Sequence, residues 1–254
     1  MRKPKKNIPE VSTSLRRSSQ VNVPSVIRDA SGISIYGRRL KSFIFCTDVA
    51  TICYTDADAV LAVYPYTPHP AIIEAITTVA SQPVIAGVGG GTTAGLRSAT
   101  IAQFAEARGA MGIVVNSPTS IETINLIESY VDCPIIATVV SSYDDIDGKL
   151  EAGVDILNVA NGKETPELVQ WIRERYPNIP IIATGGSSDE SIQRVIAAGA
   201  NAISWTPPST AELFREKMVK YRQDRRTDFM DTHDGMTMNE FEAFEASETR
   251  NEPE

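Results

Sequence analysis

The sequence has few of the residues that build disulfide scaffolds or metal centres. It contains only three cysteines, with no CxxC pair, and only two histidines. No two of these residues approach the spacing of metal ligands, and an odd cysteine count argues against a disulfide framework. We therefore expect no metal site and a reducing compartment, the cytoplasm.

The sequence also lacks long apolar runs and a basic overall charge. No apolar stretch approaches the roughly 18 residues that a membrane helix needs, and the basic start has no apolar core of a secretory signal behind it. The formal net charge of −8 argues against a nucleic acid or an anionic membrane as partner. We expect a protein that binds a small molecule, with no nucleic acid and no membrane among its partners.

Two alternating signatures are present in the middle of the chain. In one, a proline opens a short apolar run, and in the other a helical pattern ends in glycine before an apolar run. They recur at Pro83, Pro134 and Pro180 and at Gly109, Gly153 and Gly199. Together they predict eight strands, which begin near Phe43, Ala59, Val84, Met111, Ile135, Asp155, Ile181 and Ala202.

These apolar runs do not alternate, which is typical of parallel strands buried on both faces. Eight such strands alternating with helices predict an α/β fold, a (β/α)8 TIM barrel, over residues 41–222. An open doubly wound sheet is the alternative, and the regular repeat favours closure. Residues 1–40 are predicted to form a basic arm with a hairpin at the barrel bottom, and residues 223–254 an acidic, flexible tail.

Binding groups of such barrels lie at the carboxyl ends of the strands. Here these ends are rich in hydroxyls, amides and glycines and poor in carboxylates, which indicates an anion site. The predicted phosphate-binding residues are Gly89, Gly90, Gly91, Thr92, Gly185, Gly186, Ser187 and Ser209. The predicted substrate-lining residues are Tyr64, Asn116, Ser141 and Asn161.

The stretch PVIAGVGGGTTAG, residues 83–95, carries three consecutive glycines. It lacks the Lys-Ser/Thr of a P-loop and the spacing of a dinucleotide fingerprint. We interpret it as a nest of backbone N–H groups for an anion, with a purely structural turn as the alternative.

The stretch IPIIATGGSSDESIQRVIAAGANAI resembles the seventh and eighth units of the phosphate-binding (β/α)8 barrels. These include thiamin-phosphate synthase, the IMP dehydrogenase barrel, N-acylglucosamine-6-phosphate 2-epimerase and the histidine- and tryptophan-pathway barrels. The resemblance implies that Gly185, Gly186 and Ser187 hold a phosphate. This chain departs from the pattern after the eighth strand, where Pro207 and Pro208 remove two N–H donors.

Asp48, His69 and Lys163 are the candidate catalytic residues, and each has a simpler alternative role. Asp48 and His69 can cap the helices that follow them, and Lys163 can be a solvated lysine.

The sequence favours an enzyme acting on a small phosphorylated metabolite, as an isomerase, epimerase or lyase. One alternative is a non-catalytic metabolite-sensing barrel, similar to the glycerol uptake operon antiterminators. Another is a hydrolase whose water is activated by Asp48 or His69. No cofactor is predicted besides the phosphate of the ligand, a flavin nucleotide stays open, and a homo-oligomer is expected.

Overall fold

The computed structural model describes residues 9–248, apart from residues 10, 12 and 15–19. Most of the first nineteen residues of the predicted basic arm therefore lie outside the described part. The chain divides into two compact units, Met1–Pro207 and Pro208–Glu254.

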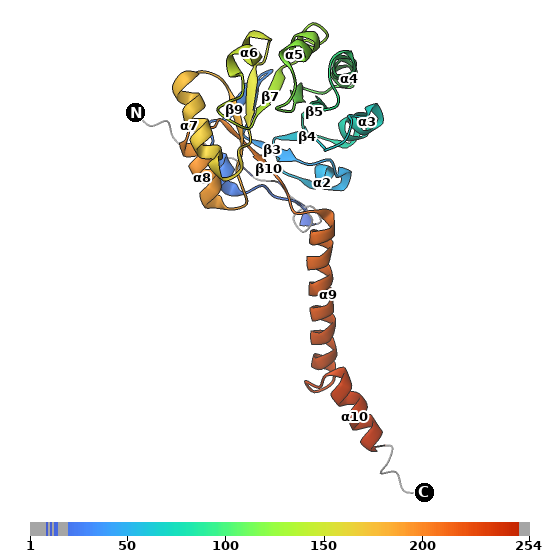
Figure 1. Cartoon of the computed structure of the whole chain (residues 1–254). Coiled ribbons are helices and arrows are strands. Elements are labelled where there is room, and N and C mark those ends of the chain that lie inside the picture. The colour runs from blue at the N-terminus through green and yellow to red at the C-terminus, as the bar shows by residue number, and fades with distance from the viewer. Residues whose placement is uncertain (1–8, 10, 12, 15–19, 249–254) are drawn as a thin grey trace. The chain divides into compact units, whose positions relative to one another are not determined.

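The first unit is a closed barrel of eight parallel strands, each followed along the chain by a helical segment (Figure 1). The strands are β3 (Ser42–Phe45), β4 (Ala59–Ala62), β5 (Val84–Gly89), β6 (Gly112–Val115), β7 (Ile135–Val139), β8 (Ile156–Val159), β9 (Ile181–Thr184) and β10 (Ala202–Trp205). The last strand pairs with the first, with Ser204 opposite Phe43. The predicted (β/α)8 barrel is confirmed, and every strand begins within one residue of its predicted start.

Seven helices surround the strands in the described part of this unit (Figure 1). They are α2 (Val49–Tyr54), α3 (Pro70–Val79), α4 (Leu96–Ala107), α5 (Ile121–Glu128), α6 (Ile146–Glu151), α7 (Thr165–Arg175) and α8 (Asp189–Ala197). Gly109, Gly153 and Gly199 have positive φ just after α4, α6 and α8. They provide the left-handed residue that a helix C-terminus favours, as the repeat predicts.

Side chains of each strand alternate between the barrel interior and the helices. The inward set, which includes Leu61, Ile85, Val114 and Ile136, forms one buried cluster. The outward set packs beneath the helices in two further clusters. This parity fixes which residue at the end of each strand faces the mouth of the barrel.

A hairpin closes the amino-terminal end of the barrel. Its strands, β1 (Ile33–Ile35) and β2 (Arg38–Leu40), pair antiparallel. Their three buried apolar side chains belong to the same cluster as the interior of the barrel. The preceding 3-10 helix η1 (Ser25–Asp29) buries Val26 and Ile27 in the outer cluster and contacts α8.

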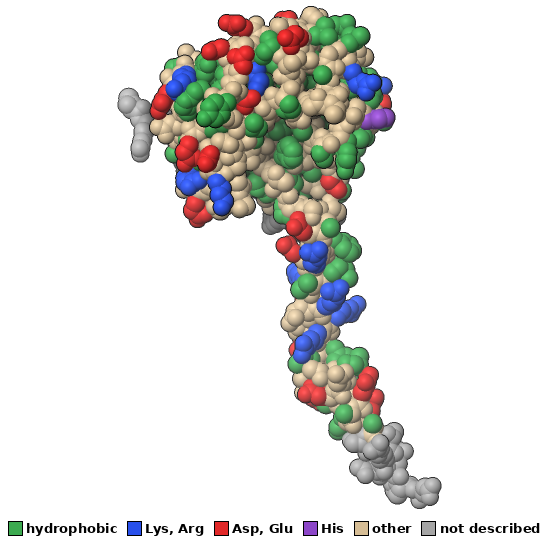
Figure 2. All heavy atoms as spheres, in the orientation of Figure 1, with side chains coloured by type: hydrophobic (Ala, Val, Ile, Leu, Met, Phe, Trp, Pro, Cys, Tyr) green, Lys and Arg blue, Asp and Glu red, His purple; other side chains and the backbone are tan. Residues whose placement is uncertain are grey.

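The second unit consists of α9 (Thr210–Thr232) and α10 (Met238–Glu248). Ser209 and Glu212 form a capping box that starts α9, and neither glycine nor proline interrupts the chain before Gly235. The boundary expected at residue 222 therefore falls inside a helix, and the flexibility of residues 223–254 stays a prediction. No side chain of α9 is buried, and Figure 2 shows apolar and basic side chains along it.

The ring of His233 stacks on Phe229 and meets Phe241 edge-on, which joins α9 to α10. Among the described residues, no helix is both long and apolar enough to cross a membrane.

Candidate functional site

Five polar side chains occupy the inward positions at the carboxyl ends of five neighbouring strands, β6 to β10. They follow the buried inward positions of the same strands by two residues and are Asn116, Thr138, Asn158, Thr184 and Ser204. Thr138 pairs with Asn158, and Thr184 pairs with Ser204. We call these five residues the polar floor. The corresponding positions of β3 and β4 carry Phe45 and Val63.

Asn158 is the most unusual member of the polar floor. It is 8% exposed, and its Nδ2 donates a hydrogen bond to Thr138 Oγ1 at 3.2 Å. Its Oδ1 is buried and has no partner among the described residues. The sequence patterns pointed to Asn161 and not to Asn158, although the single asparagine inside the apolar strand ILNV was a usable signal.

A hollow lies between the loops that follow β8 and β9. We call it the rim hollow, and its lining includes Lys163, Thr184, Gly185, Gly186, Ser187 and Arg194. Lys163 and Arg194 are exposed, and neither has a carboxylate within 4 Å in the described part of the chain. The backbone N–H groups of Gly186 and Ser187 donate to no acceptor there.

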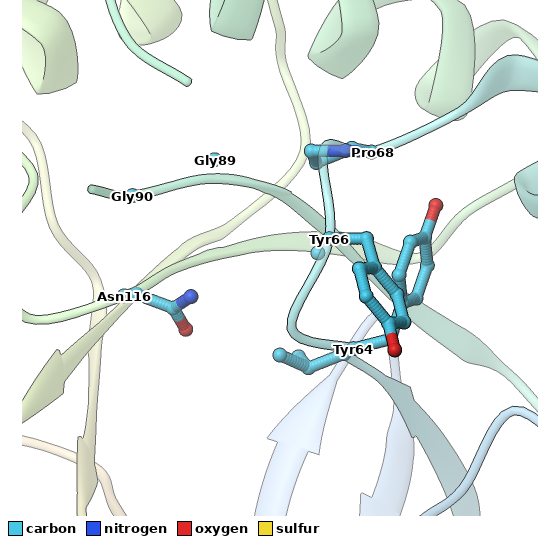
Figure 3. Close-up of a pocket in the computed structure, with 8 residues that line it drawn as sticks. Tyr64, Tyr66, Pro68, Gly89, Gly90 and Asn116 are labelled. Carbon is cyan, nitrogen blue, oxygen red and sulfur yellow. The ribbon is translucent and has the colours of Figure 1, made fainter. Parts of the chain in front are cut away.

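A smaller hollow lies above β4 and β5, and we call it the tyrosine hollow. Its lining includes Tyr64, Tyr66, Gly89, Gly90 and Asn116. Figure 3 shows the Asn116 amide pointing into it from the side opposite the two tyrosine rings.

The three consecutive glycines form a tight turn beside this hollow. The N–H of Gly90 donates to the oxygen of Thr93 at 2.9 Å. Gly90 has a φ of +132°, and a Cβ there would lie 2.4 Å from the Cβ of Asn116. Only glycine fits this contact, so the turn has a structural explanation, and an anion nest on Gly89, Gly90, Gly91 and Thr92 stays a prediction.

The two glycine loops do not line the same hollow. They follow β5 and β9, which are four strands apart in both directions around the closed barrel. Because these strands are diametrically opposed, the loops lie on opposite sides of the mouth.

Of the three candidate catalytic residues, Lys163 lies in the rim hollow with Gly185, Gly186 and Ser187. Asp48 caps α2, its Oδ1 accepting from Thr51 N at 2.7 Å. His69 caps α3, its Nδ1 accepting from Ala71 N at 3.2 Å. Asp48 and His69 line neither of the two hollows.

The other predicted site residues have local structural contacts. Ser141 Oγ accepts from Tyr143 N at 3.1 Å, and Asn161 N donates to the hydroxyl of Thr165. Ser209 belongs to the second unit and caps α9.

A buried ion pair ties the loops after β6 and β7. Lys149 is 4% exposed, and its Nζ lies 3.0 Å from Asp144 Oδ1, which also accepts from Ser117 Oγ. Asp144 Oδ2 accepts from the N–H groups of Val140 and Ser141. Burial pushes the pKa of Asp144 up, but these hydrogen bonds and the Lys149 charge outweigh it, so its pKa lies below the ordinary value.

Comparison with known proteins supports the fold. No protein-family model matches this chain, and no curated protein sequence matches it significantly. Phosphonopyruvate hydrolase in complex with oxalate and Mg++ superposes with a TM-score of 0.54 at 16% identity, covering 84% of this chain and 92% of that one. A putative phosphonomutase from Burkholderia cenocepacia J2315 gives 0.57 at 14% identity, over 77% and 95%.

A mandelate oxidase mutant with benzaldehyde gives a TM-score of 0.56 at 15% identity, covering 71% of this chain and 69% of that one. At such identities these likenesses show the (β/α)8 barrel alone. They do not support the particular phosphate-binding families that the seventh unit resembles.

Proposed function

We propose that the barrel binds the phosphate of a small metabolite in the rim hollow and acts on that metabolite above the polar floor, as an isomerase, epimerase or lyase. The observation that carries this proposal is the rim hollow itself. It is lined by two cations without a carboxylate partner and two backbone N–H groups without an acceptor among the described residues. Charge-assisted hydrogen bonds from such groups are the strongest that a phosphate can receive.

The acidic first turn of α8, with Asp189 and Glu190, lies beside this site and opposes a bound anion. The pKa of Glu190 is lowered by hydrogen bonds from its own backbone N–H and from Ser188. This carboxylate therefore interacts with the start of its own helix. Lys163 and Arg194 remain as the cations that line the hollow.

The structural neighbours are enzymes named for small organic acids, and one was solved with Mg++. A magnesium ion is held by oxygen ligands, usually one or two carboxylates together with water or substrate oxygens. The described residues contain no group of three His, Cys, Asp or Glu side chains able to hold a metal. Asp144, after β7, is already paired with Lys149. We therefore derive no step through a metal ion.

One observation favours the metabolite-sensing alternative. The five side chains of the polar floor are hydroxyls and amides, and none of them titrates near neutral pH. A turnover reaction would need an acid or base from the rim, and Lys163 is the candidate that lines the rim hollow. A sensing barrel would bind the metabolite there and release it unchanged.

The proposal is tested with inorganic phosphate, one double charge variant and one control variant. We expect phosphate to raise the melting temperature of the wild type, and Lys163→Gln with Arg194→Gln to abolish most of that rise. The matched control is Arg38→Gln, an exposed cation of β2 at the opposite end of the barrel. An undiminished response in the double variant would refute the site.

Substitution of Gly186 is less informative, because its φ is +77° and a Cβ would lie 2.6 Å from Ser191 Oγ.

A second experiment distinguishes an enzyme from a sensor. The protein is incubated with phosphorylated metabolites, which are followed by phosphorus NMR. New resonances indicate catalysis, and selective broadening without conversion indicates a sensor. Self-association also stays a proposal, supported by the exposed Phe214, Val219 and Tyr221 on α9.

A further inference from the structure

The polar floor has a chemical character distinct from the rim hollow. Its amides and hydroxyls are all uncharged, and Lys149, which donates to the backbone oxygen of Thr138, is paired with Asp144. A bound ammonium group would need a carboxylate, and a bound carboxylate would need a cation. Neutral groups that both donate and accept are matched by hydroxyls of a ligand.

The side-chain oxygen of Asn158 lacks a donor among the described residues, as do Gln82 Oε1 and Thr119 Oγ1, and of these three atoms only the Asn158 oxygen belongs to the polar floor. A buried amide oxygen without a partner lowers the stability of the fold, so most proteins avoid one. Asn158 Oδ1 is in this state although its Nδ2 is bonded to Thr138. A ligand hydroxyl, admitted by a small rotation of the amide, would supply the absent donor.

At the level of the polar floor, the side of the barrel formed by β3 and β4 is apolar. Phe45 of β3 is 38% exposed, and Val63 after β4 packs against the interior cluster and lines the tyrosine hollow. A polyhydroxylated carbon chain has polar edges and apolar C–H faces, so it matches a layer with one polar and one apolar side.

Thr184 connects the polar floor to the rim hollow. It belongs to the inward layer of β9 and also lines the rim hollow. Asn158 pairs with Ile182, two residues before Thr184. Such diagonal neighbours lie roughly 7–8 Å apart. A ligand whose phosphate lies in the rim hollow therefore needs only a short carbon chain to reach Asn158.

We infer that the polar floor binds the hydroxyl groups of the ligand, with Asn158 Oδ1 as an acceptor, so that the ligand is a phosphorylated polyhydroxy compound such as a sugar or polyol phosphate. The phosphate half of this inference rests on the proposed function, and the hydroxyl half rests on the floor alone.

The experiment compares the dissociation constants of inorganic phosphate, glycerol 3-phosphate, ribose 5-phosphate and fructose 6-phosphate. We expect at least one hydroxylated compound to bind the wild type about tenfold or more tightly than inorganic phosphate. Asn158→Leu removes this advantage and leaves the affinity for inorganic phosphate unchanged. It also holds or raises the melting temperature by a few degrees, because it removes a buried unpaired oxygen.

A second floor variant and a matched control test this result further. Thr184→Val, which keeps the side-chain shape, reduces the same advantage severalfold. Asn125→Leu, the same exchange at an exposed position of α5, changes nothing. The inference is overturned if none of the three compounds surpasses inorganic phosphate, or if Asn158→Leu and Thr184→Val both keep the advantage.

Failure of the proposed phosphate site and failure of the inferred hydroxyl site can be distinguished. If inorganic phosphate does not bind, the proposed function fails, and the floor is then tested with unphosphorylated ribose and glycerol. Binding that Asn158→Leu abolishes would support the floor, and no binding of either compound would overturn it.

Discussion

The polar groups at the two ends of the barrel differ in how far they are hydrogen-bonded within the protein. At the amino-terminal end, Arg173 of α7 donates five hydrogen bonds, four to backbone carbonyls and one to the side chain of Asn201. At the carboxyl end, the amide oxygen of Asn158 and the N–H groups of Gly186 and Ser187 have no protein partner in the described part. Arg173 and its acceptors are satisfied within the protein, whereas the unpaired groups at the carboxyl end are available to a ligand. Gln82 Oε1, just before β5, is an unpaired exception at the amino-terminal end.

Carboxylates at the amino-terminal end also fix where strands begin. Asp58 Oδ2 accepts from the N–H groups of Lys41 and Ser42 at the start of β3. Asp155 Oδ2 accepts from Ile135 N at the start of β7. These aspartates act on the fold, so changes to them should alter stability and leave ligand binding intact.

The Asp144–Lys149 pair is the strongest test of the comparison, because it lies at the carboxyl end yet is fully paired. Asp144→Ala leaves a buried lysine without a partner, which costs about 3–5 kcal/mol. This corresponds to a fall in melting temperature of roughly 6–20 °C, measured by calorimetry. A small fall would show that position at the carboxyl end, and not pairing, decides the role of a group.

The same pair makes a prediction about acid. The pKa of Asp144 is lower in the folded protein than in the unfolded chain. Its contribution is therefore complete above pH 4 or so and is lost as the pH falls through the lower folded value. Asp144→Asn should flatten the loss of stability in that window.

Arg173→Ala should give the next largest effect, about 2–4 kcal/mol, since several partly buried carbonyls lose their donor together. The midpoint of urea unfolding measures it. Arg175→Ala is the matched control on the same helix, where the guanidinium stacks on Trp171 and donates one bond. This control should cost about 1 kcal/mol or less. Equal effects of the two variants would contradict the inference that the amino-terminal end is held by Arg173.

The thiol of Cys133, just before β7, should react slowly with thiol reagents in the folded protein. Burial, together with the neighbouring Glu106, raises the pKa of its thiol to about 12. Since the thiolate is the reactive form, a disulfide reagent at pH 8 should modify Cys133 at least about a hundredfold more slowly in the native protein than in urea. Mass spectrometry of the labelled peptides measures the rate, and rapid native labelling would show that this end of the barrel opens readily.

Local patterns predicted the strands well, because apolar runs and their flanking prolines and glycines are encoded within a few residues. The site was predicted less well. Whether Asn158 faces the interior depends on the parity of β8, which is set by pairing with β7 and β9. The separation of the two glycine loops depends on the positions of their strands around the closed barrel, and neither loop carries that information.

The closure of the barrel has a consequence for how the chain folds during synthesis. Phe43 of the first strand pairs with Ser204 of the last, and η1 packs against α8. β3 can pair with β4 early, but its other edge and the contact of η1 with α8 are completed only when nearly the whole barrel has been translated. Until then, the open edge of β3 and the apolar side chains of η1 lack part of their final contacts, and a chaperone that binds nascent chains would find apolar surface there.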